Sequence, residues 1–343
     1  MNTCAFLMIS TCLMAAPIPK SDPEGTVLLV RTSPVPMELV LMKSGGTVIK
    51  RFEPNGIEGH ITYVRLVASN SKALVLAQKT RTAGVALQGN GNIPRYSAYL
   101  IDLEKHEEPA KVVIDDVIGM SRFTVIPRDK KIVFSDLDEK EAAATKQDDE
   151  LPYRSWTINW ETGKKEPLKL PKGHLVADIS ADEKSLISTR QVLVKRVEDY
   201  AKTRTYVSSL DPKESQKEPT LAVEGEFKGT QISPDGKWIL GSKLTKDENS
   251  PSQRFMYYSL NIKTQTLQKI RLPEKAYMMI GSPVWTHQGN KIAYIWYEQF
   301  MDPSLNGQIS IRYNLGLSNV TGDSQKLILQ NPPREYFTVF DWR

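Results

Sequence analysis

Cysteine is almost absent from this sequence of 343 residues, and both of its cysteines, Cys4 and Cys12, lie close to the start. Without the first 16 residues the chain has no cysteine, which excludes a disulfide framework, a thiol nucleophile and a cysteine-ligated zinc site. Histidine is also scarce, with four in the chain. The patterns HExxH, HxH and GxSxG do not occur, so zinc proteases and serine hydrolases lack their core motifs.

Long apolar runs are absent too, except for one near the start. The stretch from Cys4 to Ala16 carries no charge and is shorter than the ~20 residues of a membrane-spanning helix. Its length suits the hydrophobic region of a secretory signal, and it ends in two alanines that suit cleavage. No Lys or Arg precedes it, however, and Pro17 follows it.

We therefore expect residues 1–16 to be a signal peptide and residues 17–24 a short linker, which predicts a periplasmic or extracellular protein. The alternatives are a buried N-terminal strand, a disordered tail, or a lipid anchor on Cys12. No transmembrane segment is expected elsewhere.

Charge of one sign is not concentrated along the chain as a whole. The net charge is +5, and Lys, Arg, Asp and Glu are interspersed, so we expect no nucleic-acid partner. Residues 136–150 are an exception, with seven acids and two lysines. They could hold a cation or a basic partner, or form a solvated loop, but they lack the glycine of an EF-hand. The glycine-rich residues 81–95 lack the phosphate-loop pattern.

One short motif, SPDGK at residues 233–237, has the composition of a type I turn between two strands. Four further places combine a short polar turn with a following apolar run. The aligned turn-ending residues are Lys72, Lys130, Lys184, Lys237 and Asn290. Their spacings of 58, 54, 53 and 53 residues indicate an internal repeat.

A second series of alternating strands that end in polar turns repeats in step with the first. We align Tyr99, Trp156, Tyr206, Tyr258 and Ile311, with Asp102, Asn159, Ser209, Asn261 and Asn314 three residues later. Two repeated strand-and-turn patterns, at different places in a unit of 50–58 residues, predict a four-stranded blade. We call its strands A, B, C and D in chain order. No long helical period is present.

The two ends of the chain complete the count. YFTVFDW near the C-terminus has the pattern of a strand A, and Trp342 aligns with Trp285. The region from residue 25 begins with strands B, C and D and no A. We therefore predict an all-β fold, a six-bladed β-propeller over residues 25–343, closed by N- and C-terminal strands that share one blade.

These residues resemble a known family. SPDGK followed by an apolar strand is similar to the PD repeats, related to WD40 repeats, of the TolB-like six-bladed β-propellers. Only Ser233 to Lys237 match the motif fully, since the other four copies replace its Asp-Gly pair. The resemblance implies an extracytoplasmic binding or scaffold protein, or the propeller half of a peptidase. We see no peptidase half in this sequence.

The repeat also sorts the connections between two faces. The A–B turns are short, whereas the B–C connections are long, near residues 80–95, 137–153, 191–203, 244–253 and 299–307. All of these long connections belong on one face, around one mouth of the central channel, where binding is expected.

Candidate site residues fall on that face. Trp296, Tyr297, Phe300 and Met301 would make a protein- or peptide-binding patch if exposed, or would pack between blades. His60 and His174 precede two A strands and, with Asp116, could ligate a metal ion, although histidines two blades apart can equally be unrelated. His106 and His287 are expected on the opposite face.

The sequence favours an exported, non-enzymatic propeller without a cofactor that binds a protein or peptide partner through the long-loop face. We expect it to be monomeric or weakly associating. The alternative is a metal-assisted hydrolase or lyase with its site at the channel mouth.

Overall fold

The computed structural model describes residues 26–33, 37–67, 71–79, 85–86, 92–120, 122–126, 128–146, 149–192, 202–210, 220–223, 227–246, 253–286, 288–330 and 336–342. Within them the chain is nearly all β-structure, with one α-helix, α1 (Glu139–Ala144), and one 3-10 turn, η1 (Pro303–Leu305). No helix in these ranges is long and apolar enough to cross a membrane. The predicted signal peptide, the linker and His287 lie outside the described residues.

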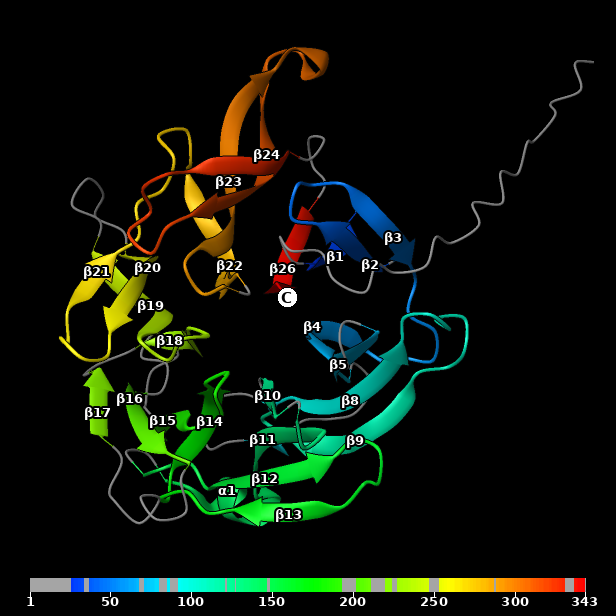
Figure 1. Cartoon of the computed structure of the whole chain (residues 1–343), viewed down its shortest axis with the longest axis vertical. Coiled ribbons are helices and arrows are strands. Elements are labelled where there is room, and N and C mark those ends of the chain that lie inside the picture. Colours follow the sequence, from blue (N-terminus) through cyan, green and yellow to red (C-terminus); the bar gives the residue numbers. More distant parts are fainter. Residues whose placement is uncertain are drawn as a thin grey trace, which may run out of the picture.

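Six four-stranded antiparallel sheets are arranged around a common centre (Figure 1). From the innermost strand outwards, the first two are β4 (His60–Val67), β5 (Lys72–Gln78), β8 (Arg95–Asp102), β9 (Lys111–Ile118); and β10 (Phe123–Ile126), β11 (Lys131–Leu137), β12 (Tyr153–Asn159), β13 (Lys165–Leu168). The next two are β14 (His174–Ile179), β15 (Ser185–Val192), β16 (Lys202–Ser209), β17 (Thr220–Val223); and β18 (Lys228–Ile232), β19 (Trp238–Lys246), β20 (Gln253–Asn261), β21 (Leu267–Lys269).

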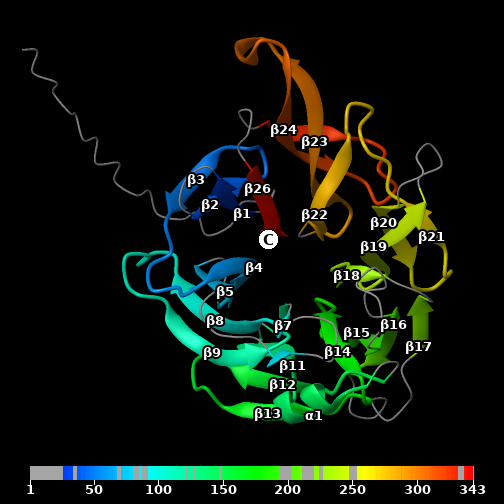
Figure 2. The same cartoon turned by 180° about the vertical axis from the view of Figure 1, so that it is seen from behind.

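The last two sheets are β22 (Met278–Trp285), β23 (Ile292–Asp302), β24 (Gln308–Ser318), β25 (Lys326–Gln330); and β26 (Tyr336–Trp342), β1 (Thr26–Ser33), β2 (Glu38–Lys43), β3 (Val48–Phe52). A small pair, β6 (Val85–Ala86) and β7 (Asn92–Ile93), lies in the connection between β5 and β8. The fold is a β-propeller with four-stranded antiparallel blades, seen from its other side in Figure 2.

Burial falls from the inner to the outer strands. The five central residues of β5 and all six residues of β14 are buried, whereas β21 is exposed throughout. Inner strands are covered by neighbouring sheets on both faces, which is why they are nearly continuous apolar runs. The outermost strands border solvent and carry polar residues.

The hydrophobic core is divided into clusters between neighbouring sheets. One cluster packs Leu74 and Leu76 of β5 against Phe123 and Phe134 of the next sheet. The sheet that contains both chain ends is packed in the same way on its two sides. Its residues Val40 and Val339 pack with Ile295 on one side, and Leu39 and Leu41 pack with Ile61 on the other.

The two ends of the described chain are paired in one sheet, as predicted. Strand β26 runs antiparallel to β1, with Trp342 opposite Val27. Trp342 and its aligned counterpart Trp285 are both buried. The sequence alignment of these two tryptophans therefore corresponds to equivalent places in two innermost strands.

The SPDGK motif is a tight turn between β18 and β19, as predicted. Ser233 donates a hydrogen bond from Oγ to Asp235 Oδ1 at 2.6 Å, and that carboxylate accepts from the Lys237 N–H at 3.2 Å. Gly236 takes a positive φ of 70°, which glycine adopts without strain. Backbone geometry accounts for this motif.

The last copy of the second series was misaligned. Asn314 does not end a strand: it lies inside β24 and is fully buried. The turn residue in the equivalent place is Asn319, whose side chain accepts from the N–H groups of Thr321 and Asp323. The reason is that β23 and β24 have 11 residues each. Residues 299–302, predicted as part of a loop, belong to this long hairpin, which projects from the ring (Figure 1).

The acidic stretch 136–150 also differs from a simple loop. Asp138 caps helix α1 by accepting from the N–H groups of Lys140 and Glu141, both at 3.0 Å. Ala142 of the helix is buried beside Ile118 and Leu137. A single turn of helix was missed because six residues are too few to display a helical period.

Candidate functional site

A cavity of about 630 Å³ lies at one mouth of the central channel. Its walls are the first residues of innermost strands, such as His60 of β4 and Lys228 of β18, together with Gln191 near the end of β15. A strands begin and B strands end on the face of the B–C connections. The cavity therefore opens on the face that the sequence predicted for binding.

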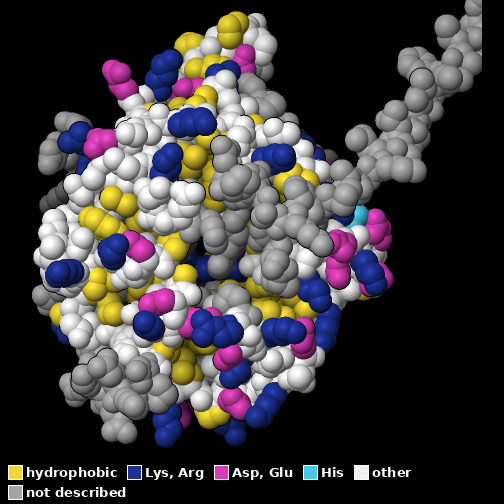
Figure 3. Space-filling view, viewed as in Figure 1, with side chains coloured by type: hydrophobic (Ala, Val, Ile, Leu, Met, Phe, Trp, Pro, Cys, Tyr) yellow, Lys and Arg dark blue, Asp and Glu magenta, His cyan; other side chains and the backbone are white. Residues whose placement is uncertain are grey.

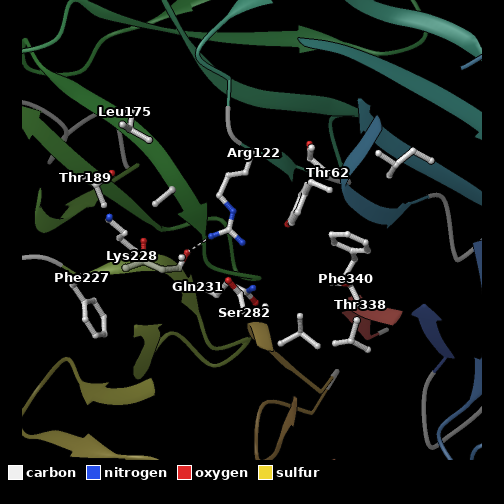
Figure 4. Close-up of a pocket in the computed structure, with 18 of the residues that line it drawn as sticks. Thr62, Arg122, Leu175, Thr189, Phe227, Lys228, Gln231, Ser282, Thr338 and Phe340 are labelled. Atoms are coloured by element: carbon white, nitrogen blue, oxygen red, sulfur yellow. Dashed lines mark hydrogen bonds between the residues drawn. The ribbon is translucent and has the colours of Figure 1, made fainter. Parts of the chain in front are cut away.

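Both polar and apolar side chains line this mouth (Figure 4). Arg122, directly before β10, extends into the cavity and donates a hydrogen bond to the carbonyl oxygen of Thr230 at 2.7 Å. Its guanidinium lies 5.2 Å from the ring centroid of Tyr63. The colour of Lys and Arg is visible inside the central hollow of the surface (Figure 3).

A second, smaller cavity of about 120 Å³ lies towards the face of the short turns, where Ser180, Pro234 and Thr286 line it. Gln231 and Val284 border both cavities. The channel is thus wide on the long-loop face and narrow on the turn face.

Around the smaller cavity lies a belt of residues from equivalent places of the innermost strands: Arg65, Thr124, Asp178, Gln231, Val284 and Asp341. Asp178 accepts hydrogen bonds from Thr124 Oγ1 at 2.8 Å and from the Ile232 N–H at 3.0 Å. Arg65 lies 3.9 Å from both Asp178 and Asp341 and donates to the Tyr63 hydroxyl at 3.1 Å. The belt joins neighbouring sheets across the channel.

The three predicted metal ligands are not brought together. His60 is exposed at the cavity, whereas His174 is buried, with Nδ1 2.9 Å from Ser188 Oγ and its ring 4.7 Å from Tyr206. Asp116 instead pairs with Arg95 at 3.1 Å and with Lys79 at 3.5 Å. Within the described ranges, no group of three or more His, Cys, Asp or Glu side chains could hold a metal ion.

The electrostatic surroundings of His174 differ from those of an exposed histidine. Burial lowers its pKa and the nearby Arg190 charge lowers it further, while Glu150 opposes both effects. The His174 side chain of β14 contacts Ser188 of β15 and does not line the cavity.

The four predicted aromatic and apolar binding residues have different environments along β23. Trp296 is buried in the core, and Tyr297 stacks between Tyr277 and Tyr313, with centroid distances of 5.3 and 6.1 Å. Phe300 is covered by the Arg312 guanidinium, 4.4 Å from its ring. Met301 alone is largely exposed, at 64%, so the four do not form one open patch.

Arg122 and Lys228 were missed as candidates from the sequence. A signal for them is present, since β4, β14 and β18 begin at a basic residue and β10 begins directly after one. This recurrence becomes visible only when the innermost strands are aligned by their true starts.

The comparisons with known proteins agree with this architecture. No family model matches the chain, and no curated protein matches it in sequence. Among solved structures, TolB from Acinetobacter baumannii has a TM-score of 0.55 at 13% identity, covering 90% of this chain and 65% of that chain. This chain therefore spans slightly less than two thirds of that protein.

A putative TolB from Agrobacterium tumefaciens has a TM-score of 0.53 at 12% identity, covering 92% of this chain and 99% of that chain. An S511A mutant of puromycin hydrolase has a TM-score of 0.50 at 7% identity, covering 90% and 53% respectively. At such low identity the likeness shows the fold alone, a propeller similar to that of TolB.

Proposed function

We propose that this protein is an exported, non-enzymatic propeller of six blades that binds a protein or peptide partner at the channel mouth on the long-loop face. The observation that carries the proposal is the cavity of about 630 Å³ on that face, against about 120 Å³ on the other. A rigid ring of sheets that presents long connections around a large concave site is typical of binding proteins.

The proposed ring has one domain, from residue 25 to residue 343, in which β26 completes the blade begun by β1, β2 and β3. The pairing of β26 with β1 supports this closure, as do the core clusters on both sides of that sheet. Closure leaves the outside of the ring with free edges only at the outermost strand of each blade, which favours a monomer or a weakly associating chain.

The likeness to TolB and to puromycin hydrolase concerns the fold, and it favours neither binding nor catalysis. The alternative, a metal-assisted hydrolase or lyase, stays a prediction. Within the described residues its candidate ligands do not form one group. No observation in the described structure favours it over binding.

Site-specific photo-crosslinking in the native cells tests the binding face. A photoreactive amino acid placed at Thr338, which lines the cavity, should capture a partner protein, whereas the same residue at Lys237 on the turn face should not. Recurrent capture of one partner from the mouth supports the proposal. Capture from Lys237 alone would show that the binding face is assigned wrongly.

Export is tested separately by measuring the mass of the purified protein from its native host. A start after Ala16 is expected, since the apolar stretch from Cys4 to Ala16 resembles a cleaved signal. A full-length cytoplasmic protein that begins at Met1 would contradict export but not binding.

A further inference from the structure

The described charged residues that line the channel mouth all have one sign. Arg122 and Lys228 line the cavity, together with the titratable His60, and none of the described lining residues is Asp or Glu. A half-enclosed cation attracts an anion more strongly than a fully solvated one, because a concave apolar wall excludes water. The mouth is therefore suited to an anionic group.

Arg122 is held in place before any ligand arrives. One N–H donates to the Thr230 carbonyl at 2.7 Å, and the guanidinium rests over the Tyr63 ring. Tyr63 is itself fixed by Phe123, edge-on at 5.2 Å, and by Arg65, which donates to its hydroxyl. Side chains fixed in this way lose little entropy on binding.

The guanidinium has donors to spare. Of its five N–H groups, one is used in the hydrogen bond to Thr230, and no carboxylate of the described residues lies within ion-pair distance of Arg122. A planar fork of N–H groups matches the two oxygens of a carboxylate. Arg122 is thus placed to bind a carboxylate from the ligand.

The backbone around the mouth is irregular in a repeated way. Five innermost strands shift register at this level: β4 between Ile61 and Tyr63, β14 between Val176 and Asp178, β18 between Lys228 and Gln231, β22 between Ile280 and Val284, and β26 between Val339 and Asp341. Each is the edge strand of its sheet. At a bulge the extra residue is left out of the ladder, so its backbone N–H and C=O groups are not paired with the neighbouring strand.

Backbone groups left out of the ladder favour an extended peptide, which supplies matching donors and acceptors at every residue. Apolar side chains between them, such as Leu175 and Val284, can receive the peptide's side chains. Sugar rings commonly pack on an open aromatic face, and at Tyr63 that face is covered by Arg122, while Phe340 meets the same ring edge-on at 88°. The observations therefore favour a peptide over an acidic sugar.

We propose that the channel mouth binds an extended peptide segment through a carboxylate, with Arg122 as its main anchor and Lys228 as a second cation. The inference rests on the proposed function, since it specifies what the long-loop face recognises. Arg122 acts here as a binding residue, and its partners Thr230 and Tyr63 position it.

The test selects binders for the purified protein from a library of random nonapeptides displayed on yeast. Wild-type protein should enrich peptides with Asp or Glu at one recurrent position, and Arg122→Gln should abolish that enrichment. Arg128→Gln is the matched control, because Arg128 lies exposed in a turn on the opposite face, 4.0 Å from Glu183. Circular dichroism verifies that each variant is folded, and Arg122→Lys provides a second, milder variant.

The best enriched peptide is then synthesised with its acid replaced by the corresponding amide. We expect the amide form, and the acid form with Arg122→Gln, to bind about 10-fold to 100-fold more weakly. Arg122→Lys should lose less affinity than Arg122→Gln. Binding of the acid form should weaken when the salt concentration is raised from about 50 to about 500 mM, because salt screens the attraction between the two charges.

Several results would overturn the inference. They are the absence of an acid preference, equal binding of the amide peptide, or an unchanged affinity with Arg122→Gln. Tighter binding of a uronate trimer than of any peptide would overturn the peptide assignment. If crosslinks from Thr338 are obtained but no acid preference is found, the proposed function stands and only this inference fails; if neither is found, both fail.

Discussion

Asp341 Oδ2 accepts a hydrogen bond from the backbone N–H of Leu66 at 2.8 Å, across 275 positions of the sequence. The bond joins β26, the last strand, to the neighbouring β4. Asp178 makes the same kind of contact to Ile232 from β14 to β18, at 3.0 Å. A buried carboxylate that reaches the next innermost strand is thus used twice to join neighbouring sheets.

Replacing Asp341 by Ala should therefore destabilise the fold. The Leu66 N–H would be left unpaired in a buried place and Arg65 would lose one of its two carboxylates, so the free energy of unfolding should fall by about 1–3 kcal/mol. Urea unfolding followed by tryptophan fluorescence measures the change. Asp129→Ala, at an exposed turn position, serves as the control and should change little; an equal loss in both variants would contradict a special role for Asp341.

Asp235→Ala should weaken the turn but leave the opposite face unaffected. Its carboxylate loses the bonds from the Ser233 hydroxyl and the Lys237 N–H, which should lower the free energy of unfolding by roughly 1 kcal/mol. Thermal unfolding gives the stability, and the crosslinking yield from Thr338 gives the binding. A large loss of crosslinking in a folded Asp235→Ala protein would assign the turn a function that the structure does not suggest.

The buried His174 should make the protein less stable in mild acid. Because its pKa is lowered in the folded state, the unfolded chain binds a proton near pH 6.5 that the folded chain does not bind until lower pH. Its contribution to stability is present above about pH 6.5 and is lost as the pH falls towards the folded-state pKa. His174→Gln should flatten the fall in stability from about pH 7 to about pH 5.

Melting temperatures measured across that pH range test this prediction, with His60→Gln as the control at an exposed histidine. An unchanged slope with His174→Gln, or an equal change with His60→Gln, would show that other groups cause the acid sensitivity.

The tip of the β23–β24 hairpin carries two exposed apolar side chains that face each other across the strands, Met301 at 64% and Ile309 at 67%. Changing both to Ser should alter stability by less than about 0.5 kcal/mol, because little surface is buried there. If the tip extends the binding face, crosslinking from Thr338 should fall. Leu327→Ser, at an exposed position of β25, is the control; unchanged crosslinking would remove the hairpin tip from the interface.

Much of the fold could be predicted because turns and strands leave local patterns. Ser233, Asp235 and Gly236 have the residue types that a tight turn requires, and apolar runs such as that of β5 mark strands covered on both faces. The constant spacing between turns then gave the blade and the pairing of β26 with β1. The alignment failed at Asn314 because strand length has no local signal, and a longer hairpin displaces every later position.

The candidate site could be predicted from the sequence only in part. The sequence indicated the correct face, since the order of strands alone decides on which side each connection lies. It did not reveal the residues at the mouth. Tyr63 lies in β4, Thr230 in β18 and Arg122 directly before β10, and they meet only where the innermost strands converge. Likewise, His60 and His174 look alike in sequence, yet one faces the cavity and the other packs into the wall.

By itself, then, the sequence determined the repeating unit, the antiparallel order of its strands and the face of the long connections, because these depend on backbone geometry over a few residues. Only the tertiary structure decided that a cationic mouth stands on that face, that Trp296 is buried and that Arg65 lies between Asp178 and Asp341. These features depend on how sheets distant in sequence pack around one channel, and packing at that range is set by side chains that no single strand contains.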